Sequence, residues 1–175
     1  MLSAAHYLLL LVPLVATTFA VPILTPSPLR STGLAKRDAV YTALPAGSGA
    51  YLYDYCGEVA HAEYVSNPAE QALATDCAAL TQRWAGPGYW TVRDAGGWVR
   101  LAQEGTCAFE VKLQPGQVGS SDQFTFGTND VGFYIRGYAN VHNADPQGRV
   151  SVWSTVVCRR EGLPLIGVDW RVIKA

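Results

Sequence analysis

The sequence predicts an α+β fold, with a mainly antiparallel sheet, two helices and two disulfides that staple them together. Three observations lead to this prediction. Several short segments alternate apolar and polar residues, as half-buried strands do, while two longer segments place apolar residues at helical spacing. Four cysteines follow a segment typical of secretory proteins, and an even cysteine count in an oxidising compartment predicts a disulfide framework.

Residues 1–20 are predicted to form a signal peptide. Residues 7–15 make an almost unbroken apolar run that is too short to span a bilayer, and Thr18 and Ala20 occupy the −3 and −1 positions of a signal-peptidase site. A buried N-terminal helix is the alternative, but the proline within the apolar run would interrupt it. We therefore expect cleavage after Ala20 and a secreted, extracellular protein.

Residues 21–37 are predicted to form a proline-rich propeptide. Three prolines mixed with Ser and Thr leave this segment too little apolar surface to build a core, and it ends at the dibasic pair Lys36–Arg37. An exposed dibasic pair fits the acidic groove of a secretory-pathway processing protease, although adjacent basic residues also occur on ordinary surfaces. We expect cleavage after Arg37.

The predicted mature domain, residues 38–175, is long enough for one core and too short for two. Three of the 13 basic residues precede it, whereas all 14 acidic residues lie within it, so its net charge is −4. A mildly acidic domain without a Lys/Arg cluster is poorly suited to bind nucleic acid or anionic membranes. We expect a monomer with no nucleic-acid partner, no stable membrane insertion and no cofactor.

The first helix is predicted to start at Asn67. Asn67 would be the N-cap, Pro68 would take the first helical position, and Glu70 would return a hydrogen bond to the cap. Helical spacing then continues through four apolar residues, Leu73, Cys77, Leu80 and Trp84. A Gly-Pro pair at 86–87 would end the helix, and Cys77 would face the core.

Two strands after this helix are predicted to form a hairpin. They cover residues 89–93 and 98–101, and the turn signal at residues 94–97 separates them. After Gly105, clean alternation predicts another strand, with a core face made of Cys107, Phe109, Val111 and Leu113.

The last third of the chain is predicted to contain a second helix and two more strands. The helix would start at Thr128 or Asn129. Its apolar face would consist of Val131, Tyr134, Ile135 and Tyr138. Residues 145–148 have the composition of a turn, and residues 150–158 are rich in β-branched residues, as strands are. Residues 168–173 would form the closing strand.

The four cysteines allow three connectivities. We favour Cys77–Cys107, because it would join the inner face of a helix to the core face of a strand. The second bridge would then be Cys56–Cys158, which joins the two ends of the domain; the other two connectivities stay open.

Several motifs occur in an order that resembles a known family. They are Cys56, Ser66 to Pro68, Asp76–Cys77, Trp90 to Val92, Gly105 to Phe109, Asn129 to Val131, Cys158 and Val168 to Trp170. Each motif alone is weak, but the ordered set with all four cysteines is similar to the fungal extracellular-protein-2 effectors, also called the necrosis-inducing-factor family.

This resemblance implies a secreted fungal effector or toxin-like protein without cofactors. Such a protein would bind a target on a host or on a competing organism, and it would be associated with virulence through plant cell death. The resemblance also implies a fold similar to that of small viral killer toxins.

A small secreted hydrolase is an alternative function. A ribonuclease would need His and Glu as acid and base, and the mature domain offers His61 and His142, while a polysaccharide-acting enzyme would need two carboxyl groups such as Glu104 and Glu110. We favour ordinary surface roles for these residues, with Glu104 in a turn and Glu110 solvated on the outward face of its strand. We therefore predict no catalytic residues.

Other residues are candidates for binding. His61 with Glu58 and Glu63 could hold a metal, but without a second nearby His or Cys we expect ordinary loop residues and no metal.

Tyr51, Tyr53 and Tyr55 alternate, so in an extended segment they would share one face. We favour the core for that face. An exposed aromatic row would instead stack on sugar rings or fill a pocket of a partner, so we keep these tyrosines and Trp153 as candidate partner-binding residues. A cell-wall-binding antifungal module is accordingly a third possible function.

Overall fold

The computed structural model describes residues 39–49, 54–93, 96–116, 123–160 and 163–175. The strands and helices, in chain order, are β1 (Ala39–Ala43), β2 (Ala62–Tyr64), β3 (Ala72–Leu73), α1 (Ala74–Arg83), β4 (Gly88–Arg93), β5 (Val99–Glu104), β6 (Cys107–Leu113), β7 (Gln123–Gly127), α2 (Thr128–Tyr138), β8 (Arg149–Val150), β9 (Val152–Arg160) and β10 (Leu163–Lys174). Neither of these helices is long and apolar enough to cross a membrane.

The strands of the described residues form three antiparallel sheets. The large sheet has the order β2-β9-β10-β6-β5, the small sheet has the order β1-β4-β7, and β3 pairs with β8. Together with the two helices and two disulfides, this arrangement confirms the predicted α+β class.

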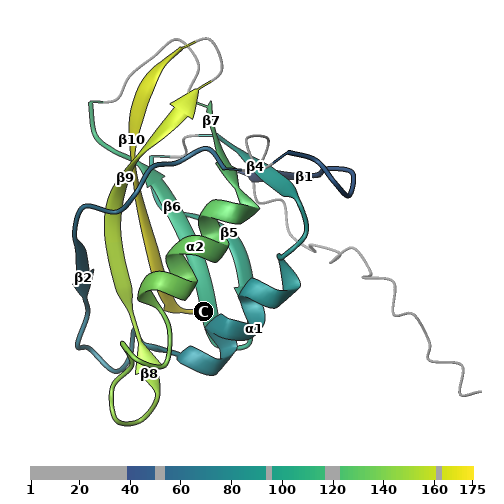
Figure 1. The fold of residues 1–175 in the computed structure, drawn as a ribbon. Helices are drawn as coiled ribbons and strands as arrows, with labels where there is room; N and C mark the ends of the chain where they lie inside the picture. The colour runs from purple at the N-terminus through teal and green to yellow at the C-terminus, as the bar shows by residue number, and fades with distance from the viewer. Residues whose placement is uncertain (1–38, 50–53, 94–95, 117–122, 161–162) are drawn as a thin grey trace, which may run out of the picture. The chain divides into compact units, whose positions relative to one another are not determined.

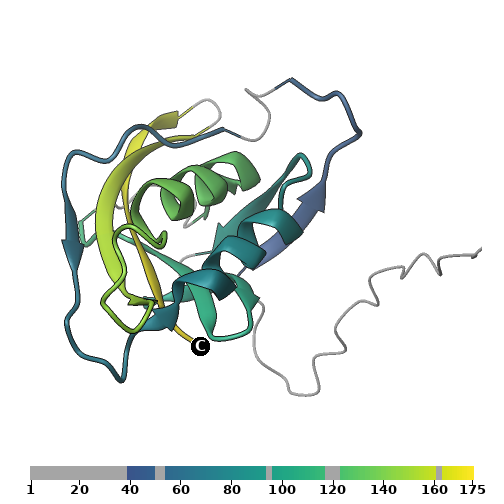
Figure 2. The same cartoon turned by 60° about the horizontal axis from the view of Figure 1, so that its bottom comes forward.

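Both helices lie side by side on one face of the large sheet (Figures 1 and 2). We call this face the helix side and the opposite face the outer face. The central strand β10 shows the division clearly, because Val168, Trp170 and Val172 are fully buried, whereas Asp169 and Arg171 between them are only half-buried. The main core therefore lies between the large sheet and the two helices.

Stacked aromatic rings form the centre of this core. The indole of Trp170 lies between Tyr134 of α2, with ring centroids 4.9 Å apart, and Phe109 of β6, at 5.8 Å, and both pairs are within 7° of parallel. Phe126 of β7 packs at an angle against Phe109 and Tyr134. The large sheet, the small sheet and α2 thus share one aromatic cluster.

The two disulfides join distant segments in the connectivity we favoured. Cys77 of α1 is bonded to Cys107 of β6, and Cys56 is bonded to Cys158 of β9. Cys77 and Cys107 are completely buried, as the predicted core faces require, and so is Cys158. Closing a loop of 30 residues removes about 3.6 kcal/mol of chain entropy from the unfolded state, and a loop of 102 residues about 4.7 kcal/mol.

The predicted start of the first helix is wrong. Asn67 closes a turn, in which its amide oxygen accepts from the Ala69 N–H at 3.1 Å and its amide nitrogen donates to Glu70 at 2.8 Å. The chain then pairs with β8 as strand β3, and the Leu73 N–H donates to the hydroxyl of Thr106. Because these bonds use the backbone groups that a helix would need, α1 begins only at Ala74.

The predicted hairpin between residues 89–93 and 98–101 is also wrong. Strand β4 pairs with β1 and β7 in the small sheet, whereas β5 pairs with β6 in the large sheet. The turn signal therefore marks the place where the chain crosses between sheets. Both partners of β4 are distant in sequence, and together the three strands bury Trp90 and Val92.

Most of the remaining predicted elements agree with the structure, but the predicted strand 150–158 is divided, because Val150 belongs to β8 and β9 begins at Val152. Helix α2 starts at Thr128 and buries Val131, Tyr134 and Ile135, and β6 has the predicted core face. The closing strand β10 is longer than predicted, since it begins at Leu163 and pairs with both β9 and β6.

Candidate functional site

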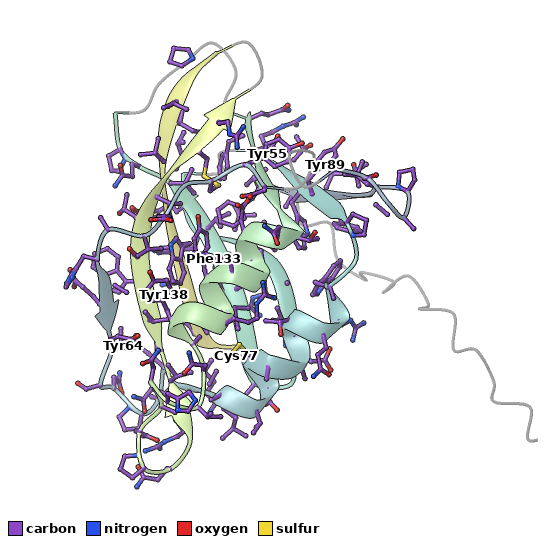
Figure 3. All side chains as sticks on the ribbon, in the orientation of Figure 1. Tyr55, Tyr64, Cys77, Tyr89, Phe133 and Tyr138 are labelled. Atoms are coloured by element: carbon purple, nitrogen blue, oxygen red, sulfur yellow. A yellow bond between two sulfur atoms is a disulfide. The ribbon has the colours of Figure 1, made fainter. Side chains whose placement is uncertain are left out.

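Aromatic side chains gather on the helix side of the domain. We call this group the aromatic stripe; its members are Tyr55, Tyr64, Tyr89, Phe133 and Tyr138. Figure 3 labels the members of the stripe, which follow one diagonal across this side. Tyr64 of β2 is 49% exposed and Phe133 of α2 is 47% exposed, while the other three are half-buried. Aromatic side chains that are both exposed and grouped are typical of binding surfaces.

Two members of the aromatic stripe, Phe133 and Tyr138, rest on the buried aromatic cluster. The Phe133 ring packs edge-on against Tyr134 at 5.7 Å, and the Tyr138 ring packs against Trp170 at 5.9 Å. Since Tyr134 and Trp170 are almost completely buried, the exposed rings stand on a rigid base. A ligand that binds there would restrict few side-chain rotamers.

Tyr55 and Tyr89 form the other end of the stripe. Their rings meet edge-on, with centroids 6.0 Å apart. Tyr89 is fixed by its strand β4, whereas Tyr55 lies in a segment without regular structure that precedes the Cys56–Cys158 bridge. The position of Tyr55 therefore depends on contacts made by the segment around it.

Asp130 of α2 provides several of those contacts. Its carboxylate accepts hydrogen bonds from the backbone N–H groups of Tyr55 at 3.0 Å and Cys56 at 3.1 Å, and from that of Gly127 at 2.8 Å. The neighbouring Tyr134 hydroxyl donates to the carbonyl of Gly57 at 2.6 Å. These bonds fasten residues 55–57 to α2, and Asp130 lies in its first turn, where acidic groups are also favoured by the helix dipole.

The ionisation of Asp130 is unusual. Burial raises the pKa of Asp130 from 3.8 to about 7, and a hydrogen bond with Asp54 acts in the same direction, although the three N–H donors lower it. Burial and the charge of Asp130 raise the pKa of Tyr134, so its hydroxyl stays protonated and remains a donor. The contact that holds Tyr55 thus includes a carboxyl group that titrates near neutral pH.

A hollow of about 250 Å³ opens beside this contact. It is lined by Asp54, Cys56, Gly57, Glu58, Asn129, Asp130, Phe133, Tyr134 and Arg159. Asp54 and Asp130 are hydrogen-bonded to each other, which places them closer than the separation of about 5 Å or more that a glycosidase pair requires. The hollow instead gives the stripe a polar recess next to Phe133.

Residues 55–158 match the model of the Hce2 family, described as "pathogen effector; putative necrosis-inducing factor". The chain belongs to the Hce2 family. The match confirms the resemblance seen in the sequence, and it covers every member of the aromatic stripe. None of the curated proteins compared with the chain is a significant match.

The residues predicted to bind a partner lie in different places in this Hce2 chain. Tyr55 joins the aromatic stripe, and it does not belong to a strand. Trp153 is 37% exposed and lies on the outer face, across the large sheet from the stripe. Tyr51 and Tyr53 lie outside the described residues, as do the processing positions Ala20, Lys36 and Arg37, so their roles stay predictions.

The predicted exposure of Glu110 is wrong. Glu110 is on the outward face of β6, but it is only 6% exposed, because Arg100 and Arg171 enclose its carboxylate at 2.9 and 2.7 Å. Glu104 forms an ion pair with Arg83 of α1 at 2.7 Å. Each of the two carboxylates therefore has its own arginine partners, on opposite sides of the large sheet.

The histidines of the Hce2 domain lie in separate segments. His61 is exposed just before β2, and His142 is exposed in the turn after α2. In the part of the chain that the structure describes, no group of three His, Cys, Asp or Glu side chains could hold a metal ion.

Sequence reasoning missed most of the site. Asp130 could have been recognised from the sequence, because an acidic side chain at the third position of a helix commonly accepts a hydrogen bond from the backbone N–H of the N-cap residue, here Gly127. For Tyr64, Tyr89 and Phe133 the sequence held no such signal, since their grouping depends on how β2, β4 and α2 pack.

Proposed function

We propose that this Hce2 protein is a secreted fungal effector that binds a target on a host or competitor cell through the aromatic stripe. Membership in a family of pathogen effectors and necrosis-inducing factors supports the general role. The two disulfides support an extracellular location, because such bonds persist in oxidising compartments. Residues 1–20 would act as the signal peptide and residues 21–37 as the propeptide.

The single observation that carries the proposal is the exposed stripe on a rigid base. Tyrosine and phenylalanine combine a large contact area with few rotatable bonds, so they give binding energy at a low entropic cost. Phe133 and Tyr64 expose about half of their surface, and the ring of Phe133 packs against the buried ring of Tyr134. Bound by a partner, these rings would become buried against a second surface.

The direct test is infiltration of the purified domain, Asp38 to Ala175, into candidate host tissue. We expect the oxidised wild-type domain to alter cell death, whether it induces or suppresses it, and the double variant Tyr64→Ala/Phe133→Ala to lose most of this effect. Val157→Ala is the matched control, because Val157 is 50% exposed on the outer face and outside the stripe. Circular dichroism would verify that all three proteins are folded.

Three outcomes would contradict the proposal. A double variant as active as the wild type would show that the stripe is not the binding surface. A wild-type domain that leaves the tissue unchanged but cleaves RNA or a glycan would favour the hydrolase, and loss of that cleavage in His61→Ala or His142→Ala would identify its catalytic group. Binding to insoluble cell-wall polymers without any tissue effect would favour the wall module.

A further inference from the structure

Trp153 stands between two hollows on the outer face of the large sheet. One hollow, of about 410 Å³, is lined by Trp153 together with Glu70, Trp98, Lys112, Asp169 and Arg171, among others. The second, of about 210 Å³, lies on the β2 side and is lined by Trp153 with His61, Glu63 and Thr155. Since Trp153 is 37% exposed and borders both, its indole forms a ridge with polar recesses around it.

Both cations of the larger hollow are already paired with carboxylates, and its remaining carboxylate, Glu70, accepts from the amide of Asn67 at 2.8 Å. Lys112 lies 3.5 Å from Asp169, and Arg171 binds Glu110 through two nitrogens at 2.7 and 2.9 Å. Arg171 also stacks over the Trp98 ring, with its guanidinium carbon 4.2 Å from the ring centroid. An anionic ligand would have to compete with these carboxylates for each cation.

The same balanced pairs suit a neutral ligand with many hydroxyl groups. A hydroxyl group both donates and accepts, so adjacent hydroxyls can donate to Asp169 while they accept from Lys112. Asp169 also accepts from Thr155 at 2.8 Å and from Gln114 at 3.1 Å, which fixes its orientation before a ligand arrives. The recess is therefore a preformed set of donors and acceptors beside an aromatic ring.

We propose that the outer face binds a neutral oligosaccharide, with one sugar ring on the Trp153 indole and its hydroxyls in the recess of Lys112 and Asp169. The C–H groups on the apolar face of a sugar ring carry partial positive charge, which the negative face of an indole attracts. The hollows on both sides of Trp153 leave room for neighbouring sugars, so a short chain fits better than a monosaccharide. This site is separate from the aromatic stripe, and neither proposal requires the other.

The test is calorimetric titration of the purified domain with hexasaccharides. The neutral probes are the β-1,4-linked and β-1,3-linked glucose hexamers and the N-acetylglucosamine hexamer, and the charged comparison is the galacturonic acid hexamer. We expect at least one neutral hexamer to bind, with a Kd that changes less than about twofold between roughly 50 and 500 mM salt, because no net charge is neutralised. Trp153→Ala should weaken this binding about tenfold or more, as loss of a central aromatic contact does.

Two variants serve as controls. Trp153→Phe keeps an aromatic face and should retain most of the affinity, and Val157→Ala changes an exposed apolar residue of the same face and strand outside both hollows. The proposal is overturned if no neutral hexamer binds, if Trp153→Ala binds as tightly as the wild type, or if the galacturonic acid hexamer binds most tightly with a steep dependence on salt. Loss of glycan binding with an unchanged tissue effect would leave the proposed function intact.

Discussion

At the scale of single residues, Asp130 connects the helix side of the molecule to the segment that carries Tyr55. Asp130 is 2% exposed, and its carboxyl group accepts hydrogen bonds from three backbone N–H groups. An acid whose pKa is raised on folding keeps its proton in the folded state at pH values where the unfolded chain has already lost it. The stabilisation from this proton is complete below about pH 4 and is lost as the pH rises toward 7, the folded pKa.

Asp130→Asn should therefore change how stability depends on pH. We expect the free energy of unfolding of the wild type, relative to that of Asp130→Asn, to fall by on the order of 3 kcal/mol between pH 4 and pH 8. Urea denaturation of both proteins across this range would measure it. Taking the difference removes the contributions of other carboxyl groups, such as Asp76 and Asp145, whose pKa values are lowered by hydrogen bonds or an ion pair. A difference that grows as the pH rises would contradict this account.

Residue-level chemistry also explains how much of the candidate site the sequence could predict. Trp153 was recognised as a candidate because an aromatic residue stood among valines in a strand, although which face it occupied required the sheet. The buried position of Glu110 was missed because its partners Arg100 and Arg171 come from two other strands. Local patterns describe which residues of a strand share a side, but they do not describe what covers that side.

At the scale of elements, a row of residues in register crosses four strands of the large sheet, β5, β6, β10 and β9, on its outer face. Arg100 of β5 lies opposite Glu110 of β6, which lies opposite Arg171 of β10, which lies opposite Trp153 of β9. The carboxylate of Glu110 is thus the negative charge between two cations on neighbouring strands. Removing that charge would leave Arg100 and Arg171 to repel each other.

Glu110→Gln should consequently destabilise the sheet. We expect a loss of about 2 kcal/mol in the free energy of unfolding, because a mostly buried ion pair is broken from one side while both arginines keep partial contact with water. Glu104→Gln is the matched control, since its ion pair with Arg83 is more exposed and should be worth less than about 1 kcal/mol. Equal losses in the two variants, measured by urea denaturation, would refute the special role of Glu110.

The elements that were predicted correctly are those in which the periodic apolar residues all face the core. Strand β6 and helix α2 each have one apolar side that meets the core, so periodicity alone describes them. The capping signal at Asn67 was genuine chemistry, but strand β8 and Thr106 compete for the following backbone groups, and both lie far along the chain. Likewise, β4 and β5 have the composition of a hairpin, yet each is paired with other strands.

At the scale of the whole molecule, the segment that defines the family does not contain a complete core. The Hce2 match ends at residue 158, whereas β10 begins at Leu163 and lies between β9 and β6 in the large sheet. β10 contributes Trp170, the ring at the centre of the aromatic stack, and the fully buried Val168 and Val172. Without β10, both of its neighbouring strands would lose their hydrogen-bonding partner on that side.

A chain that stops at residue 160 should therefore fail to fold, although it contains the whole family match and all four cysteines. We expect residues 38–160 to lack the near-ultraviolet circular dichroism and the cooperative unfolding transition of residues 38–175. Trp170→Ala in the longer chain separates loss of the ring from loss of the strand; it should fold with a stability lower by about 3 to 5 kcal/mol. Cooperative unfolding of residues 38–160 would mean that the disulfides and the remaining strands suffice, and that β10 is an accessory to the fold.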